Sequence, residues 1–306
     1  MSLSPSDIKL LKMNQYKELA TAIGASESSL KRWVDNGHLA VNRTAGGHRR
    51  IPVPEAIRFI RQRKLTVVRP DILGLGGLTE SQGDTDPATD EERLHELLVN
   101  GRLLEARSLI TSLFLQGASI ASIADGPITH ALERIGTIWK HSKEGIVVEH
   151  RALEACIYAV NALRPYVEPR EGVTAPIAIG SSLPSDPYVL PNQIAAAVLE
   201  ECGYAATNLG ADLPTSLLMN EARRLRPALV WVSASLVVNP ETASRELSEL
   251  LDILSGWNAT LIVGGREADR LTLPESPLIG RCSGMVDLMA AADRVLASGR
   301  AGEPAA

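Results

Sequence analysis

The stretch Gly180-Ser-Ser-Leu-Pro-Ser-Asp-Pro-Tyr-Val-Leu-Pro191 separates two apolar segments and decides the fold class of the chain. Residues 175–180 before it predict a short buried strand, and residues 192–202 after it predict a helix that Gly203 ends. A strand, a loop and a helix in this order are typical of a doubly wound sheet, in which ligands collect at the carboxyl ends of the strands. We therefore expect a ligand site at this loop.

The segments after this loop repeat the pattern of an apolar strand and a helix. Predicted strands cover residues 205–209, 229–233 and 260–264, and helical segments lie between them. Strands that alternate with helices are typical of a parallel sheet. The sequence therefore predicts a doubly wound, Rossmann-like parallel-sheet domain over residues 174–299, followed by a tail over residues 300–306.

Residues 91–170 predict helices throughout, interrupted near Gly101, Gly117, Gly126-Pro127 and Gly145. Apolar residues in the first half of this segment recur at the three-residue and four-residue spacing of a bundle core. They are Leu94, Leu97, Leu98, Leu104, Leu109, Ile110 and Leu113. We therefore expect a four-helix bundle directly before the α/β domain.

Residues 71–90 combine glycine with acidic residues and show no apolar periodicity, which predicts a flexible linker.

The net charge of the chain before this linker differs from the net charge of the rest. Residues 1–70 hold 13 Lys and Arg against 5 Asp and Glu, a net charge of +8. The whole chain holds 31 against 36, so the remainder carries 18 minus 31, or −13. A basic block on an acidic protein is typical of a nucleic-acid-binding module.

The basic block contains the pattern of two short helices joined by a turn. The first ends at Gly24, and Ser26 suits the N-cap of the second. One face of the second helix is apolar and predicted to be buried, with Leu30, Trp33 and Val34. The opposite face suits the major groove of DNA and carries Ser28, Ser29, Lys31 and Arg32. An ordinary amphipathic helical hairpin with a solvated polar face is the alternative interpretation.

Residues 37–52 predict a hairpin with a glycine turn beside this second helix. Its cationic residues are placed to contact phosphates, and they are Arg43, His48, Arg49 and Arg50. With the run Arg43-Thr-Ala-Gly-Gly-His-Arg-Arg50, residues 12–64 resemble the MerR superfamily of winged helix-turn-helix regulators, whose wing carries Arg-Thr-x-Gly-His-Arg-Arg. The resemblance implies a winged helix-turn-helix domain over residues 1–70 that binds a double-stranded DNA operator.

Within the predicted bundle, Trp139 is followed after nine residues by Glu149-His150. This spacing and the order of the three modules resemble the light-responsive, cobalamin-binding repressors of carotenoid synthesis, the CarH/LitR group of MerR-like proteins. The resemblance implies that this tryptophan and the Glu-His pair lie over a flat ring. It extends to the predicted α/β domain and implies further cofactor contacts by Asp186, Ser233, Ser235, Gly264 and Gly265.

The chain departs from this family in the loop after the first strand. The family has an acid, x, His, x, x, Gly, in which the His binds cobalt and the Gly admits the nucleotide tail, whereas here Tyr188 and Pro191 follow Asp186. Three expectations stay open. In the first, the pocket holds haem, with Tyr188 as one iron ligand and His150 or His141 as the other. In the second, it holds cobalamin without the lower His. In the third, it is empty, and the domain acts in oligomerisation or binds an antirepressor protein.

Together these patterns predict a DNA-binding repressor that binds a tetrapyrrole, with haem preferred over cobalamin. The redox or ligation state of the tetrapyrrole is expected to control assembly into a dimer or tetramer. An enzyme is not expected, because Ser233 and Ser235 have no neighbouring base in a nucleophile motif. Cys156, Cys202 and Cys282 follow no metal-ligand spacing and predict packed thiols. No apolar run approaches the roughly 18 residues of a membrane span, so we expect a cytoplasmic protein.

Overall fold

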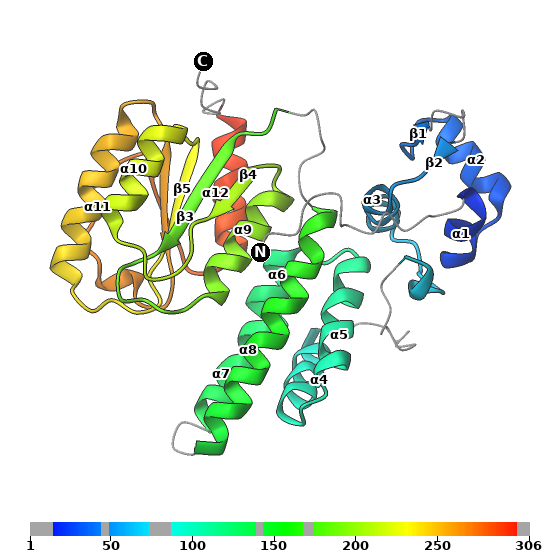
Figure 1. The fold of residues 1–306 in the computed structure, drawn as a ribbon, viewed down its shortest axis with the longest axis horizontal. Helices are drawn as coiled ribbons and strands as arrows, with labels where there is room; N and C mark the ends of the chain where they lie inside the picture. Colours follow the sequence, from blue (N-terminus) through cyan, green and yellow to red (C-terminus); the bar gives the residue numbers. More distant parts are fainter. Residues whose placement is uncertain (1–14, 44–48, 74–86, 139–142, 168–173, 299–306) are drawn as a thin grey trace.

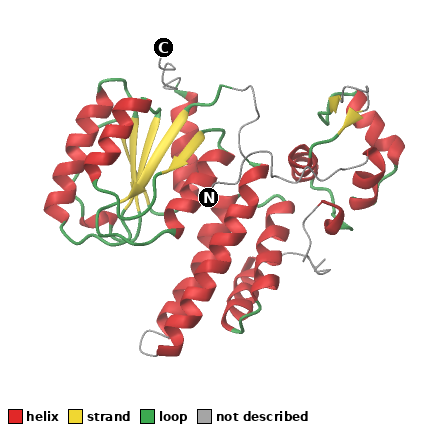
Figure 2. Cartoon of the chain, viewed as in Figure 1, coloured by secondary structure: helices red, strands yellow, loops and turns green. Residues whose placement is uncertain are grey.

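The computed structural model describes residues 15–43, 49–73, 87–138, 143–167 and 174–298 (Figure 1). Within them the chain forms a small N-terminal module, a helical segment and an α/β domain (Figure 2). None of the helices in these ranges is both long and apolar enough to cross a membrane.

The α/β domain is built on a five-stranded parallel sheet in the order β4-β3-β5-β6-β7. Its strands are β3 (Ile177–Ser182), β4 (Ala205–Asn208), β5 (Leu229–Ser233), β6 (Thr260–Gly264) and β7 (Ile279–Cys282). Every residue of β5 is buried, as expected for a strand that is covered on both faces. The four strands predicted from the sequence are present, and β7 adds a fifth at the sheet edge.

Helices cover both faces of this sheet (Figure 1). On one face lie α9 (Leu190–Glu201) and α12 (Met285–Ala297), and on the other α10 (Thr215–Leu225) and α11 (Pro240–Ser255). From β3 the chain passes first to β4 on one side and then returns past β3 to β5 on its other side. Such a reversal opens a crevice at the carboxyl ends of the strands.

The helical segment consists of α4 (Pro87–Val99), α5 (Leu103–Leu115), α6 (Ile120–Ile123), α7 (Thr129–Ile138) and α8 (Lys143–Leu163). Gly101 and Gly117 follow α4 and α5 with positive φ angles of 71° and 102°, which confirms the predicted breaks. The predicted break at Gly126-Pro127 is wrong, because one π-helical turn, Ala124–Ile128, carries the chain from α6 into α7. The wider turn accommodates a residue without an N–H. Gly145 lies two residues after the start of α8, so a helix boundary falls near it, as predicted.

The core of the helical segment is continuous with the α9 and α12 side of the sheet. Leu94, Leu98 and Ile110 are buried as predicted. Leu104, also predicted to lie in the core, is 70% exposed. It precedes the buried Ala106 by two residues and therefore lies on the opposite side of α5.

The N-terminal module contains α1 (Gln15–Ala22), α2 (Glu27–Asp35), the antiparallel pair β1 (Asn42–Arg43) and β2 (Arg49–Arg50), and α3 (Val53–Arg63). The two predicted helices and the predicted hairpin strands are present, while the residues between β1 and β2 lie outside the described ranges. The module has its own core, in which Leu19, Leu30, Ile51 and Phe59 are buried.

The predicted linker over residues 71–90 is described only at its two ends. A 3₁₀ turn, Pro70–Leu73, packs against α1 and buries Leu73 completely. At the other end α4 begins at Pro87, four residues before the predicted start of the helices. Residues 74–86 and the predicted tail, residues 300–306, lie outside the described residues.

Candidate functional site

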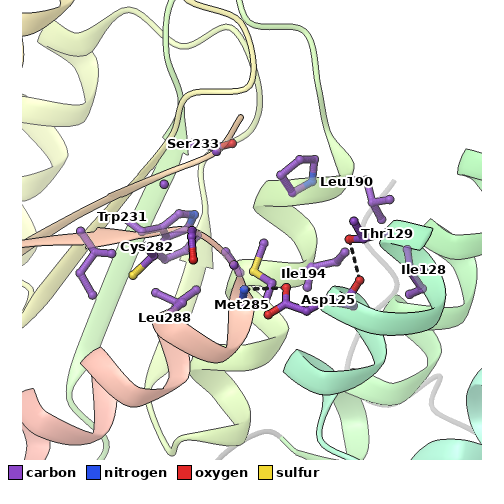
Figure 3. A pocket seen from close by; sticks show the side chains of 18 of the residues that line it. Asp125, Ile128, Thr129, Leu190, Ile194, Trp231, Ser233, Cys282, Met285 and Leu288 are labelled. Carbon is purple, nitrogen blue, oxygen red and sulfur yellow. Dashed lines mark hydrogen bonds between the residues drawn. The ribbon is translucent and has the colours of Figure 1, made fainter. Parts of the chain in front are cut away.

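A cavity of about 280 Å³ lies at the carboxyl edge of the sheet, where the α/β domain meets the helical segment (Figure 3). The ends of β5, β6 and β7 form one wall, and the first turns of α9 and α12 form another. The π turn and α7 close the third side. Most of the lining side chains are apolar, among them Ile128, Leu190, Ile194, Trp231 and Leu288.

Trp231 in the middle of β5 fills the space between β3 and α9 beside this cavity (Figure 3). Its indole N–H donates to Oδ1 of the buried Asn192 at 3.1 Å. A Cβ added to Gly180 on β3 would lie 2.1 Å from the indole ring, so the close approach requires glycine there. The tryptophan is 3% exposed and limits how far a ligand reaches toward β3.

Asp125 in the π turn joins the helical segment to the α/β domain at the cavity (Figure 3). Its Oδ1 accepts from the N–H of Met285 at 2.7 Å, and its Oδ2 accepts from the N–H of Val286 at 2.8 Å. These amides belong to the first turn of α12, where a negative charge is favoured by the helix dipole. A Cβ on Gly284 would lie 2.6 Å from this carboxylate, so glycine permits the contact.

Asp186 ties together the loops that follow β3 and β5. The residue is fully buried, and its Oδ2 accepts from the N–H groups of Ser235 at 2.7 Å and Leu236 at 3.2 Å. Its Oδ1 accepts from the N–H of Tyr188 at 3.1 Å. Three backbone donors occupy the carboxylate, which does not line the cavity.

The cofactor residues predicted from the sequence are only partly brought together. Ser233, Gly264 and Gly265 line the cavity. Ser235 lies behind this wall, with its hydroxyl 3.4 Å from that of Ser233. Gly265 also has a structural role, because its φ is +118° and a Cβ would lie 2.7 Å from the backbone carbon of Ala234.

Two of the three predicted iron ligands, Tyr188 and His150, do not line this cavity. Tyr188 is 41% exposed on the loop before α9, with the guanidinium of Arg266 5.6 Å from the centre of its ring. Glu149 and His150 are exposed on α8 and do not line the cavity. Trp139 and His141 lie outside the described residues, so their predicted roles stay predictions.

The sequence reasoning missed the residues that shape the cavity, Trp231, Asn192 and Asp125. A tryptophan in a strand predicted to be fully buried is a signal for the first of them. No sequence pattern indicates the contact of Asp125 with α12, because the partners are 160 residues apart.

The three cysteines are free and pack as small apolar residues, as predicted. Burial raises the pKa of Cys156 and of Cys202 to about 12, and that of Cys282 to about 11. Thiols with such pKa values are poor nucleophiles and poor metal ligands at neutral pH. Among the described residues, no group of three or more His, Cys, Asp or Glu side chains is arranged to hold a metal ion.

The polar face of α2 lies on the surface of the N-terminal module. The hydroxyl of Ser26 caps this helix by accepting from the N–H of Ser29 at 3.1 Å, and Leu30 is fully buried. Ser28, Lys31 and Arg32 are exposed, whereas Ser29 is half-buried. In the hairpin, Asn42 pairs with the exposed Arg50 and Arg43 pairs with Arg49. His48 lies outside the described residues.

Arg61 near the end of α3 connects the N-terminal module to both other parts of the chain. Its Nε donates to the carbonyl of Phe114 at 2.9 Å, and its Nη2 donates to the carbonyl of Ala118 at 2.9 Å. The same Nη2 donates to Oε1 of Glu201 at 2.7 Å. The other oxygen of Glu201 accepts from the N–H of Ile120 at 2.8 Å. This junction therefore joins α3, α5, α6 and the end of α9.

Known structures resemble a large part of the chain. A monomethylamine corrinoid protein from Methanosarcina barkeri superposes with a TM-score of 0.51 and 15% identity, over 69% of this chain and 100% of that chain. The α/β domain has the fold of a corrinoid protein. A cobalamin-binding protein from Desulfitobacterium hafniense DCB-2 gives a TM-score of 0.31 and 15% identity, over 70% of this chain and 100% of its own. No protein-family model and no curated protein sequence matches the chain significantly.

The sequence-based resemblance to a cobalamin-binding α/β domain thus holds at the level of the fold. The described side chains of the cavity do not fit a tetrapyrrole. Among them there is no Lys, Arg or His to pair with the propionates of haem, and Tyr188 lies elsewhere. Trp231 fills the space toward β3, and Pro191 stands in the cavity wall where the corrinoid pattern has glycine.

Proposed function

We propose that this protein is a DNA-binding transcriptional regulator, acting as a repressor, and that its C-terminal α/β domain is the sensory half. The observation that carries the proposal is the exposed polar face of α2, with Ser28, Lys31 and Arg32, beside a hairpin that presents Arg50. A helix that leads with small polar and cationic side chains suits the major groove, and cations on a neighbouring hairpin suit the flanking phosphates. The net charge of +8 over residues 1–70 supports the same assignment.

Helix α9 is suited to carry a signal from the cavity to the N-terminal module. Its first turn contributes Leu190, Pro191 and Ile194 to the cavity wall, and Glu201 at its last residue bonds to Arg61 of α3. A ligand that moves the first turn would displace the other end of the same rigid helix. The affinities for ligand and DNA would then be coupled through the position of α3.

The cofactor of the sensory half is left open by this proposal. The haem prediction gains no support from the described residues. The cobalamin alternative has the support of a shared fold, but not of Trp231 and Pro191 in the cavity wall. We propose a binding protein and not an enzyme, since the carboxylates of Asp125 and Asp186 are both occupied by backbone amides. Dimers or tetramers would place two α2 helices on one operator and raise the affinity through multivalency.

Selection of DNA sites from a pool of random duplexes tests the proposal. The full-length protein is expected to enrich one sequence motif, and an inverted repeat would indicate a symmetric dimer. A pool that stays random after repeated rounds, with retention that depends only on salt, would contradict a sequence-specific regulator.

A further inference from the structure

The cavity beside Trp231 has the size and the chemistry of a site for a small uncharged molecule. We propose that it binds a neutral, largely apolar ligand with one hydrogen-bond donor, of the size of a substituted phenol, in place of a tetrapyrrole. This inference rests on the proposed sensory role of the α/β domain and specifies the ligand class of that domain.

The size of the cavity suits a small molecule. Its volume of about 280 Å³ lies just below the range of small-molecule sites, roughly 300–1,000 Å³. Trp231 cannot rotate away from β3 without breaking its bond to Asn192, which is itself fully buried. A single-ring molecule fits within this volume.

The charges around the cavity disfavour a charged ligand. Asp125 is the acidic group beside the cavity floor, and both of its oxygens already accept from the first turn of α12. This contact occupies the helix N-terminus that would otherwise attract an anion. Glu133, exposed at the rim, adds a second negative group, and no cation lines the described wall. An anionic ligand therefore has no partner, and a cationic one would bury its charge among apolar side chains.

The few polar atoms of the cavity wall determine which hydrogen bonds a ligand can make. The hydroxyl of Thr129 donates to the carbonyl of Ala124 at 2.7 Å, so toward the cavity it offers only lone pairs. The hydroxyl of Ser233 lies in the opposite wall. A ligand that donates one hydrogen bond and is otherwise apolar would satisfy this lining.

Calorimetric titration of the full-length protein with three matched phenols tests the proposal. They are p-cresol, 4-hydroxybenzoate and 4-hydroxybenzylamine, which share one ring and carry no charge, a negative charge and a positive charge. We expect one p-cresol per chain, bound at least about tenfold more tightly than either charged analogue, since one buried charge costs more than the 1.4 kcal/mol of a tenfold change. Equal or tighter binding of a charged analogue, or no binding of p-cresol at millimolar concentration, would overturn it.

Ile194→Phe should abolish p-cresol binding by filling the cavity, whereas Leu217→Phe on the exposed face of α10 should not. Should the first variant not fold, Cys282 of the unmodified protein gives a second readout, because it lines the cavity. Its modification by methyl methanethiosulfonate is followed at pH 9, where about 1% of a thiol with a pKa of about 11 is ionised. The reaction should slow in the presence of saturating p-cresol, while the slower reaction of Cys202 keeps its rate. An unchanged rate at Cys282 would place the phenol elsewhere.

These titrations contain no DNA, so they separate two kinds of failure. The affinity for DNA is measured separately with and without p-cresol. If p-cresol binds but the DNA affinity does not change, the ligand site stands and the sensory role is refuted. DNA recognition without phenol binding would preserve the regulator and refute the ligand class.

Discussion

His95 on α4 is a buried histidine without a hydrogen bond to either ring nitrogen within the described part of the chain. Burial lowers its pKa below the ordinary 6.5 by disfavouring the imidazolium, and Arg134 acts in the same direction. The carboxylate of Glu92, whose Oε1 lies 3.8 Å from Nδ1, opposes the shift without cancelling it. The nearby His130, whose Nδ1 lies 3.3 Å from Oε2 of Glu91, also lowers the pKa of His95.

We expect the free energy of unfolding to fall as the pH drops below 6.5. The unfolded chain then protonates His95, whereas the folded chain with its lower pKa resists the proton, so protons favour unfolding. Urea unfolding of His95→Leu and of the unmodified protein at pH 7.5 and 5.5 measures the effect. The variant should gain in relative stability at the lower pH, and His38→Leu, at an exposed position, serves as control. If the two proteins differ in their free energy of unfolding by the same amount at both pH values, the lowered pKa of His95 is contradicted.

At the scale of elements, the buried carboxylate of Asp186 fixes the two loops that shape the carboxyl edge of the sheet. Asp186→Ala leaves the N–H groups of Ser235 and Leu236 without this acceptor in a buried place, and we expect a loss of about 3 kcal/mol in the free energy of unfolding. Urea unfolding followed by circular dichroism measures it, with Asp252→Ala on the exposed side of α11 as the matched control. Equal stability of the two variants would show that the loops hold without the carboxylate.

Elements with strong local patterns were predictable from the sequence. The strands β3, β5 and β6 are nearly continuous apolar segments, and Ser26 and Gly24 mark helix ends through chemistry that acts within a few residues. The strand β7 was missed because its four residues, Ile-Gly-Arg-Cys, include a glycine and an arginine and lie partly exposed at the sheet edge. The π turn was missed because glycine and proline together usually end a helix.

The position of the candidate site was predictable from the sequence, but the class of its ligand was not. The order of strand, loop and helix around Gly180 correctly indicates the carboxyl edge of the sheet. The register that sets Trp231 against Gly180, and the packing that brings Asp125 to α12, depend on contacts between distant segments. Sequence spacing does not encode such contacts, and the ligand class depends on them.

At the scale of the whole molecule, Arg61 holds the N-terminal module against the rest of the chain. Arg61→Ala removes three hydrogen bonds and the stacking of the guanidinium 3.7 Å from the ring centre of Phe114. We expect the module to separate from α5 and α9, which small-angle X-ray scattering would detect as a larger radius of gyration. Arg63→Ala removes a neighbouring exposed cation that lies over the ring of Phe59 in the same module, and it should leave the scattering unchanged. Identical profiles for both variants would show that Arg61 does not hold the module in place.

Fluorescence anisotropy with the selected DNA site tests the proposed contact of α2 with DNA most directly. The double variant Lys31→Ala/Arg32→Ala should bind about 100-fold more weakly, since each lost contact costs about 1–3 kcal/mol, and its affinity should depend less steeply on salt. Arg223→Ala/Arg224→Ala removes the same charge from the exposed side of α10 and should leave the affinity unchanged. Equal DNA affinities of the unmodified protein and both double variants would contradict a DNA-binding regulator that uses α2.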